Sequence, residues 1–357
     1  MENNRKMILC GAGGGGGNNL IRSIRKSGYP ITIIGTNMDP YALAKSTADK
    51  NYLMPSGKDP SYVDKVNRII EREGADLITP NNDTEVGVIS ENREKINCKT
   101  FLPSKEAVRA CQDKLEFYNH CKKNGIPVAE ARLVSDLDEV EKHFEELPGD
   151  KLWCKLRQCS GSQGSLPVNS PEQVKFWVEY WEKMRNIQKR QFLLLEYLPG
   201  RDFAFQSVWK DGELVIAKCC ERKSYFFARN MPSNTSSTPQ LAKMTKDQRV
   251  YDICVKAIKS LDPKPHGNFC CDLKENINGD PCMTEINIGR FFMITNIFDL
   301  TGKYNTAEMH LRSAFGDPLP EMDPYGDIDE SVYMIRDLDT EPTIVTKEQL
   351  ENSYEKI

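Results

Sequence analysis

The chain has 357 residues, of which 39% are hydrophobic and 28% are charged, so it can bury a substantial core and exceeds the usual size of one domain. Its net charge of −4 and pI of about 5.8 disfavour a nucleic-acid partner, because no overall basic field can hold a phosphate backbone. The N-terminal apolar run is too short for a signal peptide, and no stretch approaches the roughly 18 apolar residues of a membrane span, so we expect a soluble, cytoplasmic protein.

Short apolar runs alternate with helical patterns in the first third of the chain. The expected strands are residues 7–10, 31–35 and 75–79, and the expected helices are residues 18–27, 62–73 and 85–94. Strands separated by helices of this length indicate βαβ units and a parallel sheet. We therefore predict a Rossmann-like N-terminal domain over residues 1–103.

A glycine-rich run at residues 11–17 follows the first expected strand, and Asp39 follows the second. This is the context of a dinucleotide-binding fingerprint, which makes a nicotinamide-dependent oxidoreductase an alternative function. However, consecutive glycines satisfy many such patterns, and they also provide a tight turn from strand to helix. The structural interpretation is the favoured one.

Polar residues at positions 79–85 follow the third expected strand, at the place where open α/β sheets bind ligands. Asp83 or Thr84 could equally cap the next helix, which is an ordinary role for both residue types. Both interpretations stay open.

The twelve cysteines form no CxxC pair, and several lie within alternating apolar segments. Reduced, buried thiols are therefore expected. The four histidines are too scattered along the chain to suggest a set of metal ligands.

A second unit is expected to begin at Ser104, which precedes a helical pattern through Cys111, and Asp113 opens another that runs to Asn124. From Lys151 onward the pattern changes to period-two strands with polar turns, which indicates an α+β unit over residues 104–316. The extension at residues 317–357 is rich in proline and acidic residues. Capping-box spacing at residues 346–349 predicts a last short helix, and we assign no chemistry to this extension.

Asn278 and Gly279 form the preferred centre of a two-residue β-hairpin turn. Counting outward from such a turn places Asp272 opposite Glu285, and Asn287 shares their face because side chains alternate along a strand. The other face of both strands is apolar.

Like charges directly opposite each other destabilise a sheet. A hard cation with oxygen ligands would compensate, and Asp272, Glu285 and the Asn287 carbonyl form a plausible Mg²⁺ site. The alternative is a solvated hairpin face that carries acids by chance. The aligned register and the following Gly289 and Arg290 favour the metal site.

Residues 151–157 are expected to form a strand with Lys155 on its polar face, followed by a loop of small residues. Backbone N–H groups of such a loop can approach phosphate oxygens, and a lysine at its base adds charge. The loop residues that we predict to contact phosphate are Ser160, Gly161, Ser162 and Gly164. Taken alone, the loop is an ordinary hairpin connection.

Residues 191–202 read as an apolar strand followed by a turn. An adenine can lie on such a segment and bond to the backbone of Glu196, Tyr197 and Leu198, while Asp202 could reach ribose hydroxyls. The alternative is a buried core strand with a surface turn.

These elements, in this order, resemble the ATP-grasp superfamily, in particular single halves of the carbamoyl-phosphate synthase large subunit and D-alanine–D-alanine ligase. The resemblance spans roughly residues 5 to 316. It implies an ATP-grasp fold of two α+β lobes with ATP between them, behind the N-terminal parallel-sheet domain, which helps to form the acceptor pocket. The implied site residues are Lys114 and Lys155 for phosphate, the 196–202 segment for adenine and ribose, Asp272, Glu285 and Asn287 for metal, and Arg290 for the acyl phosphate.

Three positions depart from the pattern of this superfamily. Leu156 stands where proline commonly follows the lysine, Gln163 stands where the loop often carries arginine, and Arg290 lies one residue later than is usual.

The resemblance implies an enzyme that uses ATP and two Mg²⁺ (or Mn²⁺) ions to activate a small carboxylate as an acyl phosphate, which an amine then captures. Arg290 and Arg222 are candidates to hold the carboxylate and its developing oxyanion. Neither a membrane nor a nucleic acid is expected as a partner, and a homodimer is left open. A non-catalytic ATP-binding protein with the same fold is the second alternative.

Overall fold

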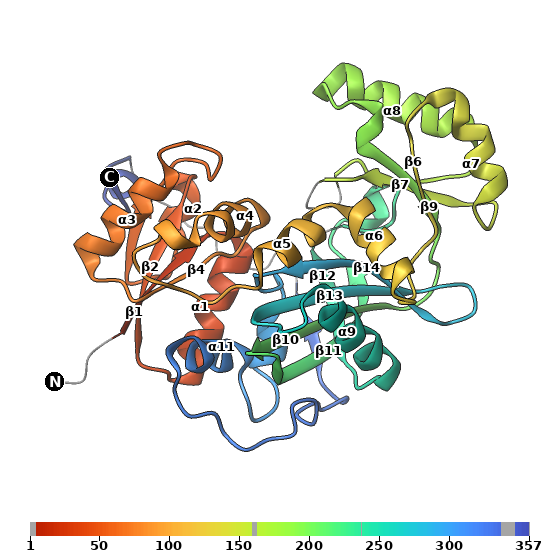
Figure 1. Ribbon diagram of the computed structural model, residues 1–357. Helices are drawn as coiled ribbons and strands as arrows, with labels where there is room; N and C mark the ends of the chain where they lie inside the picture. The colour runs from red at the N-terminus through yellow and green to blue at the C-terminus, as the bar shows by residue number, and fades with distance from the viewer. Residues whose placement is uncertain (1–4, 159–162, 237, 337–346, 357) are drawn as a thin grey trace.

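The computed structural model describes residues 5–158, 163–236, 238–336 and 347–356. Three β-sheets organise the chain, and Figure 1 shows an N-terminal domain on one side, a central lobe that projects on the other, and a C-terminal lobe between and below them. Within the described ranges no helix has the length and apolarity needed to cross a membrane.

The N-terminal domain is built on a parallel sheet with strand order β16-β3-β2-β1-β4-β5. Its strands are β1 (Arg5–Cys10), β2 (Ile31–Asn37), β3 (Lys50–Leu53), β4 (Leu77–Thr79), β5 (Lys99–Thr100) and β16 (Glu355–Lys356). Its helices are α1 (Gly15–Ser27), α2 (Pro40–Ala44), α3 (Tyr62–Glu73) and α4 (Asp83–Glu91). The predicted βαβ pattern and parallel sheet are confirmed.

The glycine-rich run forms the turn between β1 and α1. Gly13 has a φ of +79°, and a Cβ atom there would lie 1.8 Å from the carbonyl oxygen of Ala42. A Cβ atom on Gly17 would lie 2.3 Å from the carbonyl oxygen of Gly11. Asp39 caps α2 by accepting a hydrogen bond from the Tyr41 backbone N–H at 2.9 Å. Close backbone packing and helix capping therefore account for these residues without a ligand.

Helices α5 (Lys105–Gln112) and α6 (Lys114–Lys123) lead from this domain to the central lobe. The predicted helix starts are confirmed, since the Ser104 side chain caps α5 and the Asp113 side chain caps α6. The central lobe holds the antiparallel sheet β6-β9-β7-β8, formed by β6 (Ala131–Leu133), β9 (Phe192–Glu196), β7 (Leu152–Leu156) and β8 (Leu166–Val168). Helices α7 (Val140–Glu146) and α8 (Pro171–Arg185) cover one face of it.

The C-terminal lobe is a six-stranded sheet with strand order β14-β13-β10-β11-β12-β15. Its strands are β10 (Asp202–Lys210), β11 (Glu213–Tyr225), β12 (Pro239–Met244), β13 (Gly267–Glu275), β14 (Pro281–Ile288) and β15 (Tyr333–Ile335). Its helices are α9 (Gln248–Leu261), α10 (Thr295–Asp299) and α11 (Thr306–Phe315), and α10 and α11 pack against α1 of the first domain. Short 3-10 helices lie at η1 (Arg93–Lys95), η2 (Leu137–Glu139), η3 (Lys189–Gln191) and η4 (Ala228–Asn230).

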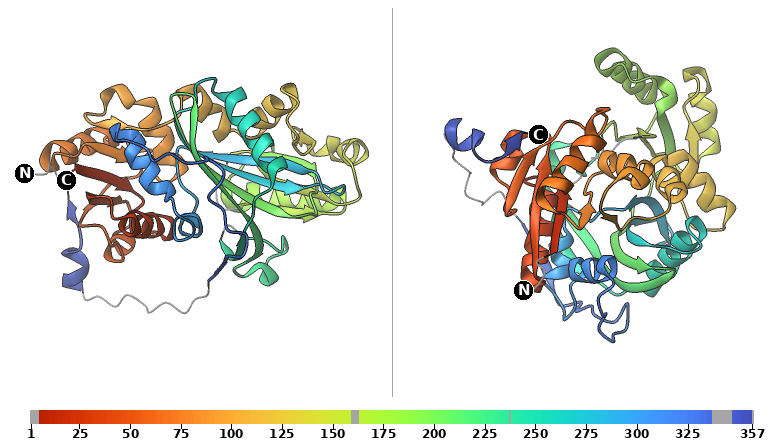
Figure 2. Two further views of the ribbon diagram at one scale, coloured as in Figure 1. Left: turned by 90° about the horizontal axis from the view of Figure 1, so that it is seen from below. Right: turned by 60° about the vertical axis from the view of Figure 1, so that its left-hand side comes forward.

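The C-terminal extension contributes to both large sheets. Strand β15 pairs with β12, and β16, which follows α12 (Lys347–Glu351), pairs in parallel with β3. Glu355 forms ion pairs with Lys50, at 3.0 Å, and with Arg72. Figure 2 shows α12 and β16 beside the N-terminal domain, far from β15. The extension therefore joins the two ends of the molecule.

The cysteines of the described residues lie mostly in the core. All eleven cysteines in the described ranges are free; ten are buried, and Cys98 is half-buried. Cys159 lies outside the described residues.

Candidate active site

The hairpin of β13 and β14 brings Asp272 directly opposite Glu285, as predicted. The predicted turn is wrong, however, because the strands end at Glu275 and Pro281 and a wider loop joins them. The Asn276 side chain holds this loop by accepting hydrogen bonds from the backbone N–H groups of Asn278 and Asp280, at 2.9 and 3.0 Å. A bulge between Asp272 and Leu273 compensates for the shifted register and restores the pair of acids.

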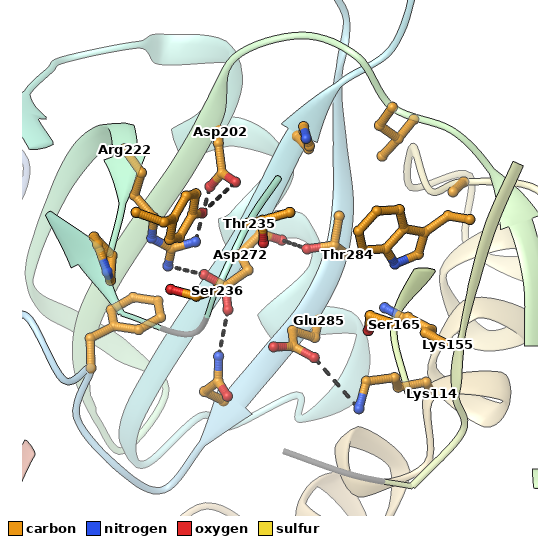
Figure 3. Close-up of a pocket in the computed structure, with 18 of the residues that line it drawn as sticks. Lys114, Lys155, Ser165, Asp202, Arg222, Thr235, Ser236, Asp272, Thr284 and Glu285 are labelled. Carbon is orange, nitrogen blue, oxygen red and sulfur yellow. Dashed lines mark hydrogen bonds and ion pairs between the residues drawn. The ribbon is translucent and has the colours of Figure 1, made fainter. Parts of the chain in front are cut away.

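Protein cations surround the two acids, as Figure 3 shows. Arg222 on β11 binds Asp272 and also Asp202, whose Oδ1 lies 3.0 Å from the guanidinium. The Lys114 Nζ lies 3.6 Å from Glu285 Oε2. Arg222 and Lys114 therefore offset part of the charge for which a metal ion was expected to compensate, and the metal site stays a prediction.

The surroundings of Asp272 and Glu285 shift their pKa values in opposite directions. Burial raises the pKa of Asp272 to about 6, against the opposing effect of Arg222. Burial also acts on Glu285, but Lys114, Lys155 and Arg290 outweigh it and lower the pKa of Glu285 below its usual value. Glu285 is therefore the acid that holds its negative charge more firmly.

The donor set fits a hard cation with one adjustment. Asn287 donates through Nδ2 to Asp272 Oδ2 at 2.6 Å, and its Oδ1 accepts from Arg290. For Asn287 to bind a cation through its amide oxygen, the amide must rotate by half a turn, which exchanges the positions of its oxygen and nitrogen. In the described part of the chain no three Asp, Glu, His or Cys side chains converge as a metal site. A cation on Asp272 and Glu285 would need further oxygen ligands from phosphate and water.

The two predicted phosphate lysines come from different elements that are tied together at their ends. Lys114 is the first residue of α6, and its backbone N–H donates to the Arg157 carbonyl at 3.2 Å. The Arg157 side chain in turn binds Asp113, with 2.7 Å between Nε and Oδ1. This connection holds the start of α6 against the end of β7, where Lys155 is located.

The predicted phosphate loop is described only at its C-terminal end. Ser160, Gly161 and Ser162 lie outside the described residues. The Gly164 carbonyl accepts a hydrogen bond from Trp177 Nε1 at 3.0 Å, so this end of the loop is anchored to α8. Ser165, the next residue, lines the cavity described below.

One cavity of about 470 Å³ brings most of the predicted site residues together. The two α+β lobes form its walls, and the N-terminal domain contributes the segment at residues 81–83. The predicted residues that line it are Lys114, Lys155, Glu196, Tyr197, Leu198, Asp202, Arg222, Asp272, Glu285, Asn287 and Arg290. The acids of the hairpin and the two lysines therefore line one cavity.

The predicted adenine segment forms one wall of this cavity. The Lys151 Nζ lies 4.2 Å from the centre of the Tyr197 ring, and the Trp153 ring lies 6.2 Å from it. The Asp202 carboxylate is bound by Arg222 and by the Tyr225 hydroxyl, the latter at 2.7 Å. A ribose hydroxyl would compete with these two groups, and the role of Asp202 in nucleotide binding stays a prediction.

The N-terminal domain supplies a contact that sequence reasoning did not identify. Asp83 Oδ1 accepts a hydrogen bond from Arg290 Nε at 2.5 Å, and Asn81 Oδ1 accepts one from the Phe291 N–H at 3.0 Å. The cap of α4 is Asn82, not Asp83 or Thr84, because its Oδ1 accepts from the Glu85 N–H at 2.9 Å. Asp83 therefore faces the cavity, which favours the ligand-site interpretation of this segment.

Glu85 lies buried behind this segment and makes the stability of the N-terminal domain depend on pH. Burial raises the pKa of Glu85 to about 7, although Tyr62 and Asn82 donate hydrogen bonds to it. Because the folded-state pKa is the higher one, the contribution of Glu85 to stability is fully present below about pH 4.5 and is lost as pH rises through about 7.

We expect Glu85→Gln to remove this dependence, since glutamine resembles the protonated acid in having one acceptor oxygen and a donor group. Relative to wild type, its free energy of unfolding should rise by up to about 3 kcal/mol between pH 5 and pH 8 in urea denaturation. A constant difference between the two proteins across this pH range would contradict the assigned pKa.

The three sheets and the cavity between the two α+β lobes define an ATP-grasp fold that follows an N-terminal parallel-sheet domain. In that cavity, Lys114 and Lys155 face the acids of the β13–β14 hairpin. Comparison with solved structures confirms the fold. Carboxyaminoimidazole ribonucleotide synthase from Aspergillus clavatus, complexed with ATP, is 19% identical with a TM-score of 0.66, covering 90% of this chain and 79% of that one. Biotin carboxylase from Campylobacter jejuni, in a β,γ-ATP complex, is 16% identical with a TM-score of 0.69, covering 88% of this chain and 72% of that one.

Sequence comparisons agree with this fold. Residues 7–101 match the family model of the PylC-like N-terminal domain. The N-terminal section of the carbamoyl phosphate synthase large chain of Methanopyrus kandleri is 25% identical over 214 residues, which cover 57% of this chain and 36% of that protein. The match thus spans little more than a third of the length of this curated relative.

Proposed function

We propose that the protein is an ATP-dependent ligase that joins a small carboxylate to an amine and releases ADP and phosphate. The observation that carries the proposal is the convergence of Asp272 and Glu285 with Lys114 and Lys155 on one cavity. The two similar structures were obtained with ATP and a β,γ-ATP ligand, which supports ATP as the nucleotide. We place the enzyme in the cytoplasm, where small-molecule carboxylates and amines are its substrates.

Asp272, Glu285 and Asn287 would hold Mg²⁺ or Mn²⁺, and we propose two ions. When bound, such an ion neutralises phosphate oxygens and keeps the terminal phosphorus open to attack. Lys114 would work beside this site, because its ammonium group already lies next to Glu285. Lys155 lines the same cavity and would add a second positive charge along the phosphates.

The proposed first step is attack by a carboxylate oxygen of the substrate on the γ-phosphorus of ATP, which breaks the bond to ADP. The amine nitrogen then attacks the carbonyl carbon of the acyl phosphate, loses a proton and expels phosphate, leaving an amide. Both steps need chiefly positioning and charge stabilisation, which fixed cations supply.

Arg290 is the candidate for holding the reacting carboxylate. It is half-buried in the cavity and bound by Asp83 and Asn287, so its guanidinium is fixed in orientation. Arg222 is the second candidate, but its guanidinium already forms ion pairs with Asp202 and Asp272. Among the residues that the structure describes, the buried Nε of Arg222 meets no hydrogen-bond partner.

An ADP-release screen tests the proposal. Wild-type protein is incubated with ATP, Mg²⁺ and a panel of amino acids and small carboxylates, each with and without amine partners. We expect ADP formation that requires both a carboxylate and an amine. Nucleotide binding without carboxylate-dependent ADP formation by any member of the panel would favour the non-catalytic alternative.

The nicotinamide-dependent alternative makes a different prediction, namely nicotinamide binding at the glycine-rich turn without Mg²⁺. The packing of Gly13 and Gly17 against backbone atoms gives these glycines a structural reason to be present. The same screen, with NADH fluorescence as a second readout, separates the two functions.

A further inference from the structure

The side-chain amide of Asn287 lies between a group that only accepts hydrogen bonds and a group that only donates them. Its Nδ2 donates to Asp272 Oδ2 at 2.6 Å, and its Oδ1 accepts a hydrogen bond from the Arg290 guanidinium. An ionised carboxylate has no proton to donate, and a guanidinium accepts no hydrogen bond. The amide therefore satisfies both neighbours in one orientation alone.

The backbone around Asn287 is fixed by the sheet. Asn287 belongs to β14 and pairs with Cys270 of β13. Its neighbours Ile286 and Ile288 are buried in the core of the C-terminal lobe. Any change in the direction of the amide therefore comes from rotation of the side chain.

The guanidinium of Arg290 has a second support that does not involve this amide. Its Nε donates to Asp83 Oδ1 at 2.5 Å, and Asp83 belongs to α4 of the N-terminal domain. This ion pair does not depend on the orientation of the Asn287 amide. Asp83 therefore holds the guanidinium at the cavity when its other nitrogen changes partner.

A cation on Asp272 and Glu285 would reverse the arrangement at Asn287. The oxygen is the only atom of this amide that binds a hard cation, so the amide must turn its oxygen towards the cation and its nitrogen towards Arg290. Two donors then face each other, and one guanidinium nitrogen loses its acceptor. A donor without an acceptor is costly away from water, so this nitrogen gains most from an anion that enters the cavity.

We propose that the Asn287 amide is a switch: when a cation binds the acids of the hairpin, the amide turns and frees Arg290 for an anionic group of the substrate. This inference rests on the metal site of the proposed function, and it adds an order of binding, with the cation first and the carboxylate or acyl phosphate second. Without the cation, the amide oxygen competes with the substrate for the guanidinium. By linkage, an anion on Arg290 strengthens cation binding by the same factor.

Chemical modification of arginine by phenylglyoxal measures this release without nucleotide or turnover. Peptide mass spectrometry follows the modification rate of Arg290 with and without Mn²⁺, and electron paramagnetic resonance measures how much Mn²⁺ the protein binds. Saturating Mn²⁺ should raise the rate at Arg290 at least about fivefold, the lower end of typical coupling between sites. Arg109 is the internal reference, because it forms an exposed ion pair with Glu91, does not line the cavity and should react at an unchanged rate.

Asn287→Asp is the decisive variant. Its carboxylate can bind a cation with one oxygen and Arg290 with the other, so no rotation is needed. It should bind Mn²⁺ at least as tightly as wild type and yet lose most of the acceleration at Arg290. The electrostatic effect of the ion itself is present in both proteins, so the difference between them belongs to the amide. Circular dichroism verifies that each variant is folded.

Two kinds of failure are distinguished by the same measurements. Bound Mn²⁺ with an unchanged rate at Arg290, or equal acceleration in wild type and Asn287→Asp, overturns the switch and leaves the metal site standing. Equal Mn²⁺ binding by wild type and Glu285→Ala overturns the metal site of the proposed function, and the switch with it.

Discussion

Glu285→Ala should lower the rate of ADP formation by about a thousandfold, with any carboxylate and amine that support turnover in wild type. Glu285 holds its charge more firmly than Asp272, contacts Lys114, and stands on the face of the hairpin that lines the cavity. Its removal would take away one ligand of the proposed metal site and leave Lys114 without the acid beside it. The variant should also lose the Mg²⁺-dependent part of its affinity for a non-hydrolysable ATP analogue, measured by calorimetry.

Asp280→Ala is the matched control for this variant. Asp280 belongs to the same hairpin and carries the same charge, but it is exposed in the loop and lies outside the cavity. Its activity and its Mg²⁺-dependent nucleotide binding should equal those of wild type. Full turnover in Glu285→Ala would refute the metal-binding role, even if the ligase activity itself were established.

Gly13→Ala should lower the free energy of unfolding by more than about 4 kcal/mol, or prevent the N-terminal domain from folding. The added Cβ would lie 1.8 Å from the carbonyl oxygen and 2.4 Å from the carbonyl carbon of Ala42. Both atoms belong to the backbone of α2, so a side-chain adjustment cannot relieve the collision. Urea denaturation followed by circular dichroism measures the effect.

Gly28→Ala separates this collision from backbone strain. Gly28 has a φ of +71°, similar to Gly13, but a Cβ atom there meets nothing within 4 Å. Its substitution should cost only the roughly 1–2 kcal/mol of a left-handed alanine. Equal losses in the two variants would show that backbone conformation, rather than close packing, explains the glycine at position 13.

Local patterns were sufficient to predict much of the fold. Helix α3 has the predicted bounds, and Ser104 and Asp113 begin the helices that they were expected to cap. The predicted pairing of Asp272 with Glu285 is confirmed, although the predicted two-residue turn is wrong. The wider loop shifts the register in one direction and the bulge shifts it back. Loop conformation depends on side-chain hydrogen bonds such as those of Asn276, which periodicity does not reveal.

Contacts between distant segments could not be predicted in the same way. Arg222 lies 50 positions from Asp272 and meets it only because β10 lies between β11 and β13 in the sheet. The Arg290 contact with Asp83 requires the packing of two domains across 207 positions. The sequence does suggest a ligand at residues 79–85, but nothing in the local pattern names the arginine that meets it.

The return of the chain end to the first sheet has a consequence for biosynthesis. Strand β3 exposes its outer edge until residues 355–356 emerge and cover it as β16. At roughly 5–20 residues per second, a ribosome needs tens of seconds to deliver that strand. During this time the nascent N-terminal domain presents unpaired backbone groups that invite aggregation.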